Sequence, residues 1–480
     1  MTDETSKKNM GGETMTPKEL GTAPIGKLLR YYALPSIIGT TVNVLYNVVD
    51  RIFIAQGVGS VALSGLAATL PVMTILQAMG VLIGAGASAR ISILMGQKKN
   101  ADAEELLGNA FFLSLILNVV FITLAMIFMK PLLLNFGASE ASLPYAVDYL
   151  SVVVPGNIFA NLCFSFNAVM RATGYPKKAM YTMMIGAFLN FILDPIFIYV
   201  FHMGIQGVGI ATVISMFIGM VWVLTHFLSK EAYLKIRFQN FKLKKRHILG
   251  IVSIGVAPFL VQLLASLTTF IKNTSLQKYG ALSDITLHNG DLAVASFGIV
   301  SSIAMMILMV SFGLSHGMQP IVGYNFGAGN MKRVKETFFL AAKINVTVGF
   351  IGAMIALLAP DLLTRIFTGD PELIHVSRTA MAIELVATWC ACFQVTSVQF
   401  FQSIGYAGKS IAISLSRQLI FLVPLLLLLP LVFGVEGVWY STPISDFMAA
   451  ILSVIMVWHY FKGVNKQIND ALIADPLRKQ

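Results

Sequence analysis

The sequence predicts an all-α polytopic membrane protein with twelve transmembrane helices, and two observations carry this prediction. The 480-residue chain is 56% hydrophobic and only 12% charged, with a mean hydropathy of +0.76, whereas soluble domains carry about 25% charged residues. Long stretches also contain no Asp, Glu, Lys or Arg: 52–89, 106–129, 195–229, 247–271 and 292–331. Each is long enough to cross a bilayer as a helix, which takes about 20 residues, and none shows the alternating polarity of a transmembrane β-strand.

Glycine, proline and polar clusters divide the apolar sequence into twelve spans. Their expected starts are near Tyr31, Val61, Leu106, Pro144, Ala179, Gly204, His247, Leu292, Phe338, Leu373, Ser410 and Val435. We expect a tail at 1–30, a first six-helix lobe at 31–228, a basic linker at 229–247, a second six-helix lobe at 248–462 and a second tail at 463–480.

The basic residues indicate the orientation of the chain. Most of the 34 Lys and Arg lie in alternate connections, as in 90–99, 171–178 and 230–246, and the opposite connections hold few, among them Lys272. By the positive-inside rule, both tails are expected in the cytoplasm and the protein in an inner or plasma membrane. The net charge of +11 is therefore a topology signal, and we expect no nucleic-acid partner.

The two halves of the chain repeat each other. An offset of 231 residues places Gly86 on Gly317 and Gly96 on Gly327, and smaller shifts pair Pro35 with Pro258. Because each half has six spans, both halves enter the membrane in the same direction, as in the parallel repeats of secondary transporters. Two such bundles would leave a cleft between them that could open to each side in turn.

Polar residues within the spans predict a cation site in the first lobe. Asn43, Asn47 and Asp50 share one face of the first span, Asn190 and Asp194 share a face of the fifth, and Thr212 lies in the sixth. At 1.5 Å per residue, Asp50 and Asp194 lie roughly 10 Å, and Thr212 roughly 12 Å, from the outer helix ends. Two carboxylates, an amide and a hydroxyl at one depth suit a monovalent cation such as Na⁺, or a proton.

Other candidate groups are fewer. Glu384 in the tenth span is a second, weaker candidate for coupling, because an acid within a span is costly and often functional. The three cysteines lie in apolar runs and indicate no disulfide framework. No nucleotide motif, zinc helix or catalytic triad is evident, so we expect no cofactor and no enzyme activity.

Four segments together resemble the multidrug and toxic compound extrusion (MATE) transporters. They are Asp50-Arg-Ile-Phe-Ile-Ala-Gln-Gly57, Asn190-Phe-Ile-Leu-Asp194-Pro195, Gly204-Ile-Gln-Gly207-Val-Gly209 and Gln319-Pro-Ile-Val-Gly-Tyr-Asn-Phe-Gly327, and the likeness covers about residues 25–465. The resemblance implies two six-helix bundles around a V-shaped cleft and export of cationic or amphipathic drugs in exchange for H⁺ or Na⁺.

The resemblance also implies roles for single residues. Asp50 matches the family's first-helix acid, Asn190 and Asp194 its fifth-helix pair, and Thr212 its sixth-helix hydroxyl. Some members carry further acids in the seventh and tenth helices, where this chain has Ser266 and Phe393.

The resulting hypothesis is a monomeric antiporter in the lipid bilayer, whose partners are small organic cations or amphipathic drugs. One alternative keeps the scaffold and changes the cargo: a flippase or exporter of an amphipathic or lipid-linked metabolite, which would need a more cationic cleft. A channel or a membrane-embedded enzyme is the remaining alternative. An enzyme should show a nucleophile with a base, or metal ligands, facing one compartment.

Overall fold

The computed structural model describes residues 17–58, 60–136 and 139–474, apart from some side chains within these ranges, and its regular structure is entirely helical. The long helices are α2 (Ile25–Gly57), α3 (Ser60–Gly96), α4 (Asn100–Ile127), α6 (Leu143–Ala172), α7 (Pro176–Pro195), α8 (Gly204–Leu228), α9 (Lys245–Gly280), α10 (Gly290–Gly327), α11 (Met331–Leu358), α13 (Pro371–Glu384), α14 (Thr388–Ser403), α15 (Ala407–Leu415) and α16 (Val423–Ala474). Short helices α1 (Pro17–Thr22), α5 (Met129–Asn135) and α12 (Pro360–Arg365) lie between or before them, and π-helical segments η1 (Ile196–Val200) and η4 (Ser416–Leu422) continue α7 and α15.

Twelve membrane crossings follow from these helices. Nine helical stretches of the described chain are long and apolar enough to span a bilayer, and the bent pair of α13 and α14, at 51° to each other, makes ten. One stretch, 407–464, contains two crossings, because Gly434 interrupts α16 with a φ of 57° that only glycine adopts easily. Helix α2 adds the twelfth, since its 33 residues are long enough although its polar residues lower its hydropathy.

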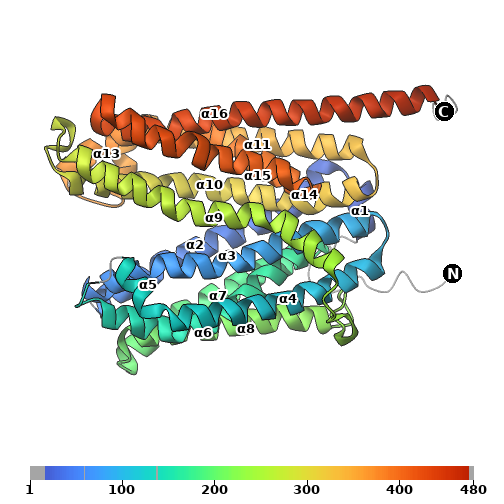
Figure 1. The fold of residues 1–480 in the computed structure, drawn as a ribbon, viewed down its shortest axis with the longest axis horizontal. Coiled ribbons are helices and arrows are strands. Elements are labelled where there is room, and N and C mark those ends of the chain that lie inside the picture. The colour runs from blue at the N-terminus through green and yellow to red at the C-terminus, as the bar shows by residue number, and fades with distance from the viewer. Residues whose placement is uncertain (1–16, 59, 137–138, 475–480) are drawn as a thin grey trace.

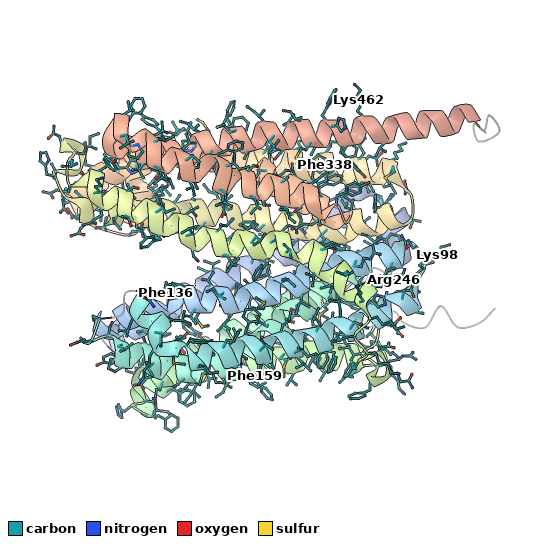
Figure 2. The ribbon with its side chains drawn as sticks, in the orientation of Figure 1. Lys98, Phe136, Phe159, Arg246, Phe338 and Lys462 are labelled. Carbon is teal, nitrogen blue, oxygen red and sulfur yellow. The ribbon has the colours of Figure 1, made fainter. Side chains whose placement is uncertain are left out.

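The crossings form two bundles. In Figure 1, α2–α8 lie together below and α9–α16 lie together above, with α1 and the end of α16 at the same end of the molecule. Figure 2 places Lys98 and Arg246 at that end, which we call the basic end, and Phe136 at the opposite end. Burying apolar side chains within each bundle produces separate clusters, around Phe166 in the first half and Trp439 in the second.

The helix boundaries confirm the internal repeat. Helices α3, α4 and α6 end at Gly96, Ile127 and Ala172, and α10, α11 and α14 each end 231 residues later. The turns match too, because Gly204 and Gly434 both have a φ of 57°. Equal lengths and equal turn conformations show that the two halves have the same fold.

The two halves meet along α3 and α10, and residues at equivalent positions of the repeat contact each other. The side-chain nitrogen Nε2 of Gln319 donates to Oγ of Ser88 at 2.8 Å, and these residues are 231 apart. One turn further, a Cβ built on Gly323 would lie 2.8 Å from Cβ of Ser92, which is again its repeat partner. Such self-equivalent contacts occur only on a twofold axis, so the pseudo-symmetry axis passes through this seam.

At the basic end the seam closes to backbone contact. A Cβ on Gly96 would lie 2.0 Å from the carbonyl oxygen of Tyr324, and one on Gly327 would lie 2.1 Å from that of Ile93. The pairs are related by the repeat, because Ile93 and Tyr324 are also 231 residues apart. Only glycine permits helices to approach this closely, so both halves are held together tightly at the basic end.

The connection between the halves packs on the first half. Glu104 on α4 forms an ion pair with Arg237 at 3.3 Å, and Phe241 stacks on Phe111 with ring centroids 5.3 Å apart. These contacts fix the linker against the basic end of α4.

Candidate cation site in the first half

Helices α7 and α8 bring three polar side chains together in the first half. Nδ2 of Asn190 donates to Oδ1 of Asp194 at 3.2 Å, one helical turn away, and also lies 3.4 Å from Oγ1 of Thr212 on α8. All three are almost completely buried, with Asp194 at 0% exposure. A polar group in this position needs hydrogen bonds to offset its lost hydration, so the asparagine connects the acid to the hydroxyl.

Two further helices complete the cluster. Asp50 of α2 lies within hydrogen-bonding reach of Asp194 and is itself 8% exposed. Tyr149 of α6 also faces both acids and contacts Thr212 through its hydroxyl. Five side chains from four helices therefore share one buried polar site.

The structure places the four predicted residues side by side, in agreement with their matched depths along the helices. The supporting residues are arranged differently. Asn43 lies on α2 seven residues before Asp50 and lines a cavity between the halves, about 10 Å away along the helix. The side chain of Asn47 is outside the described part of the chain. Tyr149 was not anticipated, because a tyrosine in an apolar run gives no signal that distinguishes it from a packing residue.

The chemistry of the cluster is that of an oxygen site for a cation. Two neighbouring carboxylates repel each other, and a proton or Na⁺ between them would remove this repulsion. Hydroxyl and amide oxygens can serve as additional ligands. Among the described residues no group of three or more His, Cys, Asp or Glu could hold a metal ion, so a bound Na⁺ would need the oxygens of Asn190 and Thr212.

Glu384 has a different environment. Nζ of Lys272 lies 2.7 Å from Oε2 of Glu384, and both side chains are buried. The same ammonium donates to Oγ1 of Thr442 at 2.8 Å and lies 4.3 Å from the centre of the Phe297 ring. Glu384 is thus the partner of a lysine. The expected position of Lys272 in an outer connection is wrong, because α9 continues to Gly280 and carries it within the helix.

A second buried acid of this half is also paired. Nε of Arg417 lies 2.6 Å from Oδ1 of Asp446, which is 4% exposed. In the second half, therefore, both of these buried carboxylates contact basic side chains, whereas Asp194 in the first half contacts an amide and another carboxyl group.

Comparison with known proteins identifies the family. The sequence profile of the MatE family matches residues 35–196 and 279–428. Multidrug export protein MepA of Staphylococcus haemolyticus is 27% identical over 435 residues, which cover 90% of this chain and 93% of that protein. MepA of Staphylococcus aureus is 27% identical over 446 residues, covering 91% and 94% of the two chains.

Solved structures share the fold. An outward-facing multidrug resistance MATE family transporter of the MOP superfamily superposes with a TM-score of 0.87 at 23% identity, over 95% of this chain and all of that one. A MOP superfamily transporter from Pyrococcus furiosus gives the same TM-score, identity and coverage. The profile match covers more than half of the sequence and the fold agrees, so the chain belongs to the MatE family, the multidrug and toxic compound extrusion transporters, and is not an enzyme.

Proposed function

We propose that this protein is a secondary antiporter that exports cationic or amphipathic drugs from the cell in exchange for H⁺ or Na⁺. The observation that carries this proposal is the buried cluster of Asp50, Asn190, Asp194 and Thr212. Its carboxyl groups provide a charge that can be neutralised by an entering cation. The relatives named multidrug export proteins support the choice of drugs as cargo.

The coupling we propose is electrostatic. With its carboxyl groups ionised, the cluster attracts a proton or Na⁺ from outside, since a charge buried among apolar helices is unfavourable by several kcal/mol. Binding of the cation removes that cost and permits α2, α7 and α8 to repack, which releases the drug. Loss of the cation to the cytoplasm then restores the first arrangement.

Alternating access of the two lobes would deliver the drug. The backbone contacts of Gly96 and Gly327 close the basic end, and this end carries the basic connections that the positive-inside rule assigns to the cytoplasm. We therefore propose that the structure corresponds to a state closed toward the cytoplasm, in a cell membrane with both termini inside. We also propose that a single chain is the transport unit, since both lobes belong to it.

Efflux of a cationic dye from vesicles tests the proposal, with a pH gradient and a Na⁺ gradient imposed separately. We expect one gradient to drive efflux, and Asp50→Asn or Asp194→Asn to reduce the driven rate at least tenfold. Asp148→Asn is the matched control, because this acid lies on α6 of the same half and is partly exposed; its rate should equal that of the wild type. Normal driven efflux by both cluster variants would refute the coupling role.

The flippase alternative has one observation in its favour. Arg171 of α6 lines a cavity between the halves, and an exporter of anionic amphiphiles would need cations there. Movement of a fluorescent anionic lipid across proteoliposome membranes, with no dye efflux, would favour this alternative.

A further inference from the structure

A cavity between the two halves contains a cationic side chain that the cation cluster does not use. It encloses about 110 Å³ and is lined by α2, α6 and α7 of the first half, with Arg171 and Met183 among its residues, and by His316 of α10 from the second half. A buried water needs only about 10–15 Å³ of such space, so the cavity has room for several waters or one small ion.

Arg171 has unused hydrogen-bonding capacity. A guanidinium carries five N–H donors, and in the described part of the chain Arg171 makes one side-chain hydrogen bond, from Nη1 to Oδ1 of Asn167, and no ion pair. Nδ2 of Asn167 donates to the carbonyl oxygen of Ala179 at 2.7 Å, which fixes the amide and holds the arginine in place. Its remaining donors are available to a ligand in the cavity.

The other polar groups of the cavity supply no competing negative charge. Ser36 and Thr40 use their hydroxyl protons on backbone carbonyls of Tyr32 and Ile37, at 2.8 and 2.9 Å. The imidazole of His316 makes no hydrogen bond to the described residues, so one of its N–H groups can also donate. Helix α7 begins at Pro176 beside the cavity, and the positive end of its dipole adds to the charge of Arg171.

We propose that this cavity binds a monovalent anion between Arg171 and His316, either a chloride-sized inorganic ion or the carboxylate group of a transported compound. A cation in a low-dielectric site requires a counter-charge, and the fork of a guanidinium matches a carboxylate or a halide. Because the two residues come from different halves, the bound anion stabilises the arrangement in which the basic end is closed. This inference goes beyond the proposed cation coupling and does not depend on it.

Anion-dependent thermal stability of the purified full-length protein tests the site. Bulky isethionate is replaced by chloride or by formate at constant pH and ionic strength, and the midpoint of unfolding is followed. We expect a saturable rise, and Arg171→Gln should raise the half-saturating concentration at least tenfold. Arg90→Gln is the matched control, because this arginine belongs to the same half but does not line the cavity; it should behave as the wild type.

His316→Ala and Arg171→Lys provide independent tests if Arg171→Gln does not fold. Each should weaken the anion effect, the first by removing the second half's donor and the second by removing the planar fork. A response to chloride alone identifies an inorganic ion, and a response to formate alone identifies a carboxylate. A midpoint independent of the anion, or unchanged half-saturation in the Arg171 and His316 variants, would overturn the proposal.

Discussion

The ion pair between Lys272 and Glu384 predicts a large loss of stability when one partner is removed. Both side chains are buried, at 7% and 4% exposure, and their charged atoms are 2.7 Å apart. Oε1 of Glu384 makes no hydrogen bond to the described residues, so the lysine provides the main compensation for this carboxylate. Lys272→Met keeps the apolar stem of the side chain and deletes only its charge.

The expected cost follows from the charge left behind. Removing one member of a buried pair typically destabilises a protein by about 3–5 kcal/mol, because the other charge remains buried and uncompensated. Replacing both members at once leaves no such charge, so Lys272→Met combined with Glu384→Gln should cost less than about 1.5 kcal/mol. The two single changes should therefore be strongly non-additive, with a coupling of at least about 2 kcal/mol.

Unfolding in detergent, followed by tryptophan fluorescence during denaturant titration, measures these values. Trp389 and Trp439 belong to the second half and report on it. If Lys272→Met costs less than about 1 kcal/mol, or if the two changes simply add, the pair does not hold the structure as argued. Transport by the double variant is also informative: normal driven efflux would show that Glu384 has no role in coupling.

Three further changes test other contacts. Gly327→Leu should separate the halves at the basic end, because its Cβ would lie 2.1 Å from the carbonyl oxygen of Ile93; spin labels on Lys98 and Lys332 should report longer distances, and an unchanged distribution would contradict the seam. Gln319→Leu removes the 2.8 Å bond to Ser88 and should lower the free energy of unfolding by about 0.5–1.5 kcal/mol; an unchanged denaturation midpoint would indicate that this bond is replaced by another. Tyr149→Phe removes the hydroxyl beside Thr212 and should shift the pH or Na⁺ dependence of efflux, whereas an identical profile would exclude the tyrosine from the cation site.

Local spacing was sufficient to predict the meeting of the acids. Asp50 and Asp194 each lie seven residues from the outer end of an apolar helix, and helix rise converts this number into depth. Depth alone does not determine which helices are neighbours. The resemblance to a family provided that information for Asn190 and Thr212, and the hydrogen bonds among these side chains agree with it.

The pairing of Lys272 could not be predicted in the same way. The lysine is 112 residues from Glu384, and a charge near the end of an apolar run resembles the start of a loop. Helix α9 extends over 36 residues, more than a bilayer requires, and no local signal predicted this extra length. The seam was hidden for another reason: the repeat predicted that Ser88 and Gln319 are equivalent, but only the symmetry axis brings equivalent residues into contact.

The repeat gives the Lys272 pair a meaning that neither half has alone. Helices α2 and α9 end at Gly57 and Gly280, so Asp50 corresponds to Asn273, beside Lys272. Gly204 corresponds to Gly434, so Thr212 corresponds to Thr442, the hydroxyl that accepts from Lys272. The second half thus holds an ammonium group, attached to its own chain, near the place where the first half holds its cluster. A cation entering there would have to displace Lys272 from Glu384, and we therefore infer that ion coupling belongs to the first half.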